Sequence, residues 1–207
     1  MRIAAKVNQT TLGIAMGNSQ NWKLLSRKSL REFRVVSVQE HMYEHVPPGK
    51  QRGYVVCDSA DCVFTIPVTP DNKIVFIRQF RHGRGEVVLE IPGGVMNPGE
   101  TPETTGLREL KEETGYVPES VEMFGPLLPN PGLDTAQYHI ALARNCRPLF
   151  PPAPEPSEEI KIELRPLESV SEMISSGELT HALCIAAFAV TKAHRTQKDD
   201  STSAAER

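Results

Sequence analysis

The fold is decided by residues 94–116, which read GVMNPGETPETTGLRELKEETGY. Thr101 followed by Pro102 and Glu103 predicts the start of a helix, because Thr caps the first turn, Pro suits the first helical position and an acid favours the positive end of the helix dipole. Gly115 is a natural C-terminal stop. The stretch therefore predicts a loop followed by a helix of about three turns.

Three carboxylates share one side of this predicted helix. Glu109 lies three residues before Glu112 and four before Glu113, and like charges at this spacing each cost roughly 0.2–0.5 kcal/mol. A hard cation such as Mg²⁺ would relieve the repulsion. Glu100 in the preceding loop could fold back onto the same site, and a free carbonyl at Gly93 could supply one more oxygen ligand. The alternative is a solvated acidic helix face.

The fixed letters of the stretch match the Nudix box, G-x5-E-x7-R-E-U-x-E-E-x-G-U, in which U is a bulky apolar residue and the last U is here Tyr116. Seven fixed letters match a given window by chance roughly once in 10⁸ to 10⁹. The chain therefore resembles the Nudix hydrolases. The resemblance implies an α+β fold, an α/β/α sandwich with a mixed β-sheet between helices, and hydrolysis of a nucleoside diphosphate linked to another moiety.

The segments around the box narrow the resemblance. Residues 76–81 read FIRQFR and residues 89–94 read LEIPGG, which resemble the V-x-Q-[YF]-R and E-[LF]-P-A-G motifs of the ADP-ribose and ADP-sugar pyrophosphatases. Pro131, 16 residues after Gly115, stands where that group carries a proline. The resemblance extends over about residues 22–194. It implies cleavage of ADP-ribose or a related nucleoside diphosphate sugar with Mg²⁺, or alternatively Mn²⁺, to a nucleoside monophosphate and a sugar phosphate.

The resemblance also assigns roles to individual residues. The implied catalytic residues are Glu109, Glu113 and Arg108, and the implied metal ligands are Glu109, Glu113, Glu112, the Gly93 carbonyl and, less directly, Glu100. Arg108 would orient the box carboxylates by ion pairs rather than touch the substrate.

Four residues are candidates for substrate binding. Arg81 would contact the diphosphate or the terminal sugar, and Trp22 would stack on the base. Arg52 would be a second phosphate contact, and Pro131 marks the loop past the box. Arg81 and Arg52 could alternatively be surface residues without a role in binding, and Trp22 could equally anchor a core or an interface.

One position departs from the pattern of the group. Many members place a glutamate, thought to activate water, in a P-G-x-x-x-E loop, whereas residues 131–136 end in Ala136. Glu109, Asp134 or the metal alone then remain candidates for activating water. The departure keeps two alternatives open: GDP-mannose or another nucleoside diphosphate sugar as substrate, and a non-catalytic ligand-sensing module. A hydrolase of oxidised nucleoside triphosphates would share the box but not the flanking Gln-Phe-Arg motif and the downstream proline.

The rest of the chain predicts strands before and after the box. Strands are expected at 33–39, 53–57, 62–68, 74–80, 87–91, 138–143 and 160–164, and helices at 167–176 and 180–194. The proline-rich residues 147–157 cannot be regular structure. We expect a flexible extension at 1–20, a β-rich, dimer-forming segment at 21–60, the Nudix domain at 61–195 and a disordered tail at 196–207.

Composition excludes several classes of protein. With 23 Lys and Arg against 26 Asp and Glu, the chain does not bind nucleic acid through bulk positive charge. The longest apolar run, residues 182–190, is half of what a membrane-spanning helix needs. The four cysteines show no metal-ligand spacing. We therefore expect a cytoplasmic homodimer that acts on a small molecule.

Overall fold

The computed structural model describes the backbone of residues 19–205 and the side chains of residues 19–194. The expected flexible extension at 1–20 lies almost wholly outside the described residues. The centre of the molecule is a seven-stranded mixed sheet. Its main strands, in spatial order, are β12 (Ile160–Pro166), β5 (Lys73–Arg81), β4 (Cys62–Val68), β10 (Tyr138–Arg144) and β9 (Ser120–Leu127).

Strand β10 runs parallel to β4, and the other pairs in this sheet are antiparallel. The short strands β6 (Glu86–Glu90) and β7 (Gly93–Val95) pair with β5 and β4. A separate two-stranded ladder joins β8 (Tyr116–Val117) to β11 (Arg147–Pro148). The mixed sheet predicted from the sequence is confirmed.

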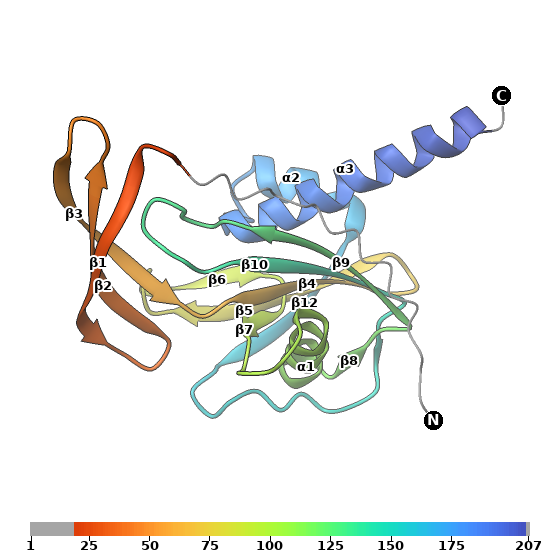
Figure 1. Cartoon of the computed structure of the whole chain (residues 1–207). Coiled ribbons are helices and arrows are strands. Elements are labelled where there is room, and N and C mark those ends of the chain that lie inside the picture. Colours follow the sequence, from red (N-terminus) through yellow and green to blue (C-terminus); the bar gives the residue numbers. More distant parts are fainter. Residues whose placement is uncertain (1–18, 206–207) are drawn as a thin grey trace.

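Helices cover both faces of the sheet (Figure 1). Helix α1 (Pro102–Thr114) lies on one face, and η1 (Leu167–Ser169), α2 (Val170–Ser175) and α3 (Ala182–Ala205) lie on the other. Side chains of β4 alternate between the two layers. Gly106 of α1 lies so close to Val63 and Thr65 that an added Cβ would be 3.1 Å from each side chain. The α/β/α sandwich is therefore the observed architecture.

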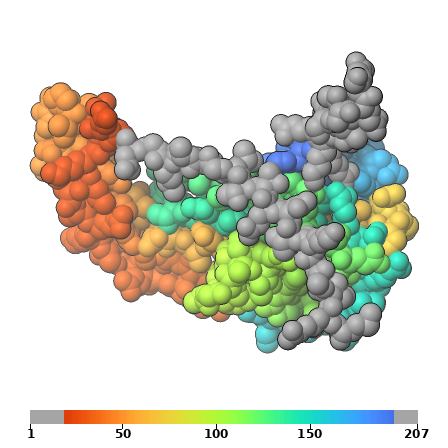
Figure 2. Space-filling view, turned by 45° about the vertical axis from the view of Figure 1, so that its right-hand side comes forward, coloured from red at the N-terminus to blue at the C-terminus, as the bar shows by residue number. Residues whose placement is uncertain are grey.

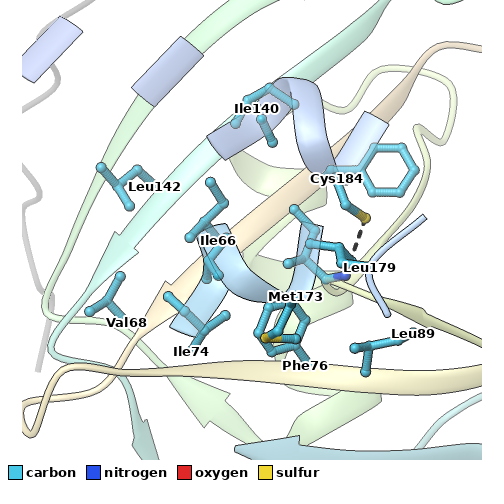
Figure 3. Close-up of a cluster of buried hydrophobic side chains, with 14 of the residues drawn as sticks. Ile66, Val68, Ile74, Phe76, Leu89, Ile140, Leu142, Met173, Leu179 and Cys184 are labelled. Carbon is cyan, nitrogen blue, oxygen red and sulfur yellow. Dashed lines mark hydrogen bonds between the residues drawn. The ribbon is translucent and has the colours of Figure 1, made fainter. Parts of the chain in front are cut away.

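The main hydrophobic core fills the layer between the sheet and helices α2 and α3 (Figure 3). Labelled members are Ile66, Val68, Ile74, Phe76, Leu89, Ile140, Leu142, Met173, Leu179 and Cys184. The Cys184 thiol accepts a hydrogen bond from the Ile91 amide at 3.4 Å. Burial raises the pKa of this thiol to about 12. It is therefore an unreactive core residue that ties α3 to the link between β6 and β7.

Helix α1 begins and ends as the sequence predicts. The Thr101 hydroxyl accepts a hydrogen bond from the Thr104 amide at 3.2 Å. Gly115 has φ of +75° and donates its amide to the Lys111 carbonyl. A Cβ at Gly115 would lie 2.0 Å from the Phe150 carbonyl oxygen. Glycine is thus required both by the left-handed backbone and by the segment that crosses over it.

Residues 22–59 form a second sheet with the order β1 (Trp22–Glu32), β2 (Val36–His45) and β3 (Lys50–Ser59). The sequence predicted strands at 33–39 and 53–57 and missed β1. Residues 33–35 instead connect β1 to β2, and the Phe33 amide donates a hydrogen bond to the Val36 carbonyl. Figure 2 shows this sheet, in red and orange, projecting from one end of the body.

Helix α3 continues to Ala205, whereas the sequence predicted a disordered tail from residue 196. Residues 182–205 contain no Gly or Pro, so nothing in the chain stops the helix. Residues 206–207 lie outside the described residues. No helix in the described part of the chain is long and apolar enough to cross a membrane.

Candidate active site

Two adjacent glycines hold two glutamates of α1. The Gly93 amide donates a hydrogen bond to Glu113 Oε2 at 3.0 Å. An added Cβ on Gly94 would lie 2.4 Å from the carboxyl carbon of Glu109. Strand β7 therefore forms a surface that receives one carboxylate at each glycine, and any side chain at position 94 would displace Glu109.

Both carboxylates are poorly solvated. Glu113 is 2% exposed, and burial raises its pKa well above the usual value, with a further rise from the nearby charge of Glu109. Burial also raises the pKa of Glu109, although its ion pair with Arg108 opposes the rise. Burial and mutual repulsion therefore both disfavour the ionised forms of these two carboxylates.

Arg108 is the centre of an ion-pair network. Its guanidinium contacts Glu100 at 2.9 Å, Glu109 at 2.7 Å and Glu112 at 3.0 Å, and it donates to the Val95 carbonyl at 3.2 Å. The network therefore orients the carboxylates of Glu100, Glu109 and Glu112 around the Arg108 guanidinium.

Glu100 is fully engaged in this network. Its two oxygens accept hydrogen bonds from Arg108, from the Thr105 hydroxyl and from the Asn97 amide. Arg108 is the main reason that the pKa of Glu100 lies well below its usual range. Glu112 is different, because its side chain is 45% exposed. Of the expected ligand carboxylates, Glu109 and Glu113 are the most shielded: Glu109 is 14% exposed and pairs with Arg108, and Glu113 is 2% exposed and is held by the Gly93 amide.

Arg81 is fixed by a buried acid. Its Nε and Nη2 donate to the two oxygens of Glu90 at 2.8 and 2.5 Å, and Glu90 is 0% exposed. Arg81 also acts on Glu113, lowering the pKa of that carboxyl. A bidentate pair of this kind fixes the guanidinium plane. Arg81 is therefore held at the same site as the box carboxylates.

The charge of a third acid also acts on this pair. Glu158, just before β12, raises the pKa of both Glu109 and Glu113. The sequence analysis missed it, because the proline-rich residues before it predict only irregular structure. That segment crosses α1, where the Ala153 amide donates a hydrogen bond to the Glu112 carbonyl at 2.7 Å. No spacing in the sequence signals this crossing.

The loop past the box has a structural role. Asp134 accepts hydrogen bonds from the Ser59 hydroxyl and the Ala136 amide at 3.0 and 2.9 Å, so both of its oxygens are occupied. Ala136 is 2% exposed, and Pro131 is exposed at the turn. The loop thus ties β3 to the large sheet, and Asp134 is not a free base.

Trp22 and Arg52 come together on the small sheet. The Trp22 ring lies 4.7 Å from His45 and 6.2 Å from Tyr54 between ring centroids, and the Arg52 guanidinium lies 5.5 Å above the Tyr54 ring. Figure 1 shows the small sheet beyond the end of the large one, away from α1. The structure therefore groups the expected binding residues in two places.

The NUDIX domain family matches residues 59–188. The chain belongs to the Nudix family. It is 33% identical over 129 residues to a "Methanol dehydrogenase activator" of Bacillus methanolicus, covering 62% of this chain and 69% of that protein. It is 31% identical over 121 residues to an "ADP-ribose pyrophosphatase" of Bacillus subtilis, covering 58% and 65%.

A third relative is an "ADP-sugar pyrophosphatase" of Mus musculus, 40% identical over 86 residues, which cover 40% of this chain and 39% of that protein. A solved structure titled "Crystal structure of ADP compounds hydrolase" superposes with a TM-score of 0.74 at 21% identity, covering 87% of this chain and 98% of that one. The Nudix fold predicted from the sequence is thereby confirmed, as is the family of hydrolases that it resembles.

The donor set of this Nudix chain fits a hard divalent cation only in part. Among the described side chains, no three His, Cys, Asp or Glu residues gather as a ready-made metal site. Mg²⁺, however, uses one or two carboxylates together with water and substrate phosphate. The Glu109 and Glu113 pair has that composition, and its desolvation supplies a reason to take up a cation.

Proposed function

We propose that the chain is a divalent-metal-dependent pyrophosphatase that hydrolyses ADP-ribose or a related nucleoside diphosphate sugar to a nucleoside monophosphate and a sugar phosphate. The observation that carries the proposal is the desolvated Glu109 and Glu113 pair, seated on Gly93 and Gly94, at a site that also holds Arg81. The names of the bacterial and mouse relatives point to the same class of substrate.

Glu109 and Glu113 would hold Mg²⁺, or alternatively Mn²⁺, with the Gly93 carbonyl as a further oxygen ligand. When bound, the metal would neutralise diphosphate charge and favour attack at phosphorus. Glu112 is an outer candidate, because it is exposed and bonded to Arg108. We assign Glu100 to holding Arg108, since its oxygens are already occupied.

Arg81 would bind the diphosphate. Glu90 engages its Nε and Nη2, which leaves Nη1 to donate to a phosphate oxygen. The buried carboxylate thus turns a long, rotatable side chain into a fixed donor. A preorganised cation is worth more in a shielded site than in water.

Glu158 is our candidate for the general base. Its charge acts on the same two carboxylates, its Oε2 accepts a hydrogen bond from the Glu155 amide at 3.2 Å, and it follows a segment anchored on α1. In the proposed reaction, water attacks phosphorus, its proton passes to the Glu158 carboxylate, and the bond to the bridging oxygen breaks. This assignment removes the difficulty raised by Ala136, because the carboxylate arrives from another loop. It also makes a purely sensing module the weaker alternative.

The small sheet would recognise the nucleobase and join two copies of the chain. Trp22 has an exposed fraction of 45% and could stack on a base, with Arg52 beside it. Strands β1–β3 and their turns expose several large apolar side chains: Leu30, Phe33, Val35 and Val55. Such an unpartnered surface is typical of an interface. We therefore propose a homodimer formed through this sheet.

A coupled phosphatase assay tests the proposal. The chain is incubated with Mg²⁺ and ADP-ribose, ADP-glucose, GDP-mannose, UDP-glucose, NADH, diadenosine polyphosphates or dGTP. We expect inorganic phosphate to appear only after phosphatase is added, with one diphosphate sugar far ahead. Folded protein that turns over none of these compounds, yet binds ADP-ribose by calorimetry, would instead support the sensing module.

A further inference from the structure

One buried polar atom has no partner. Among the described side chains, Gln79 Oε1 is the only buried side-chain nitrogen or oxygen without a hydrogen bond, and Gln79 is 6% exposed. Buried polar groups are almost always paired, because an unpaired acceptor loses its bonds to water without compensation. An exception of this kind needs a functional explanation.

The strand register places Gln79 in the candidate active site. Side chains at positions 79 and 81 of β5 share a face of the sheet. Ile77 lies opposite Glu90, and Gln79 lies opposite Val88. Since Arg81 binds Glu90, its guanidinium reaches back along the strand past position 79.

Strand β12, the other neighbour of β5, also connects Gln79 to the candidate active site. Gln79 lies opposite Ile160 of β12, and Glu158 precedes Ile160 by two residues. Position 79 therefore lies between β6, which carries Glu90, and the start of β12, two residues after Glu158. This places Gln79 beside the ion pair that would hold the diphosphate.

The chemistry of the surroundings defines the missing donor. The carboxylates of Glu90 and Glu158 are hydrogen-bond acceptors, whereas Arg81 directs Nε and Nη2 to Glu90 and would direct Nη1 to phosphate. Ionised phosphate oxygens are also acceptors and cannot serve. Within the proposed substrate class, the sugar hydroxyls are abundant donors that lie close to the diphosphate.

We propose that Gln79 Oε1 accepts a hydrogen bond from a sugar hydroxyl of the bound nucleoside diphosphate sugar and so helps to determine substrate specificity. The inference rests on the proposed function and deepens it. It explains why the chain keeps an unpaired acceptor in its core: the partner arrives with the substrate. A ligand that presents only phosphate oxygens at this point leaves the acceptor unpaired and binds less well.

The test is Gln79→Met, which keeps the length of the side chain and removes the acceptor. We expect the melting temperature to rise by about 2–4 °C, because an unpaired buried group is lost. We expect KM for ADP-ribose to rise about tenfold with kcat unchanged. This combination of higher stability and weaker substrate binding is the signature of a group kept for its ligand.

Thr69→Val is the matched control. Thr69 is equally buried at 6% exposed, but its hydroxyl is paired, since it donates to Asp71 Oδ1 at 2.6 Å and accepts from the Lys73 amide at 2.9 Å. Removing a paired group should lower the melting temperature and leave KM unchanged. If Gln79→Met behaves like this control, Gln79 has a structural role and the inference is wrong.

Inorganic pyrophosphate separates a sugar hydroxyl from other donors. Because pyrophosphate carries no sugar hydroxyl, it should inhibit Gln79→Met as strongly as it inhibits the wild type, while the affinity of the variant for ADP-ribose falls. An equal loss for both ligands overturns the inference. Binding of ADP-ribose is measured by calorimetry as well, so that a wild type without turnover refutes the proposed function while the affinities still decide the role of Gln79.

Discussion

The box helix and the small N-terminal sheet hold their side chains in opposite ways. Around α1, Glu109, Glu113 and Arg108 are shielded and tied to backbone or to one another. On β1–β3, Trp22 and Val55 are 45% and 53% exposed, and strand β1 is almost entirely exposed. One region buries its functional side chains, and the other exposes large apolar and aromatic ones.

We relate this difference to two tasks: the chemistry at phosphorus for the region around α1, and the recognition of the base for the small sheet. A site that handles charge at phosphorus needs fixed donors and acceptors, because preorganisation supplies most of the stabilisation. Recognition of a base needs an open aromatic surface that a ligand or a second copy can cover. Substitutions in the first region should therefore act on kcat, and substitutions in the second should act on KM or on assembly.

The largest effect is expected from Glu113→Gln. The change keeps the size of the side chain and a carbonyl oxygen for the Gly93 amide, but it removes half of the proposed cation site. We expect kcat to fall by roughly 10³-fold, equivalent to about 4 kcal/mol, with no loss of thermal stability. Steady-state kinetics with Mg²⁺ and a melting curve measure both. Glu103→Gln, in the first turn of the same helix, is the control and should stay active.

A smaller loss of activity is expected from Glu158→Gln. Removal of a general base typically costs at least about 10² in rate, and binding of the substrate should be unchanged. Glu159→Gln is the matched control, since the next residue is exposed. If both variants are equally active, the general base is a group other than Glu158.

Variants of the Arg81–Glu90 pair test whether this ion pair serves folding stability, substrate binding or both. Arg81→Ala leaves a fully buried carboxylate without its cation, which costs about 3 kcal/mol, and it also removes the proposed phosphate contact. The double variant Arg81→Ala with Glu90→Gln should recover much of the stability but none of the activity. Urea unfolding and kinetics on the three proteins separate the two effects. Recovery of activity would show that Arg81 does not bind substrate.

The sequence predicted the box helix to the residue, because its signals are local. Thr101 caps it and Gly115 ends it through contacts within a few positions. Strand β4 was also predicted with its observed bounds, since an apolar run of this length is typical of a central strand. Local capping and burial are the parts of a fold that a single sequence encodes most directly.

The remaining features depend on contacts between distant segments. Strand β1 is exposed along most of its length, so it lacks the apolar alternation by which strands are recognised. Glu158 and Gln79 gain meaning only when β12 pairs with β5. Asp134 was a candidate base until its hydrogen bonds to Ser59 and Ala136 assigned it to the loop. Motif spacing does not contain these pairings.

The smallest effect is expected from Trp22→Ala, which tests the small sheet. The side chain is exposed, so we expect the melting temperature to change little. Loss of stacking on a base costs roughly 1–3 kcal/mol, so KM for ADP-ribose should rise about tenfold with kcat unchanged. Leu30→Ala, in the proposed dimer surface on the same strand, is the comparison that shows what a loss of assembly does to KM. Light scattering on both variants shows whether the change acts through assembly: a Trp22→Ala protein that loses mass and activity together would make Trp22 an interface residue rather than a base-binding one.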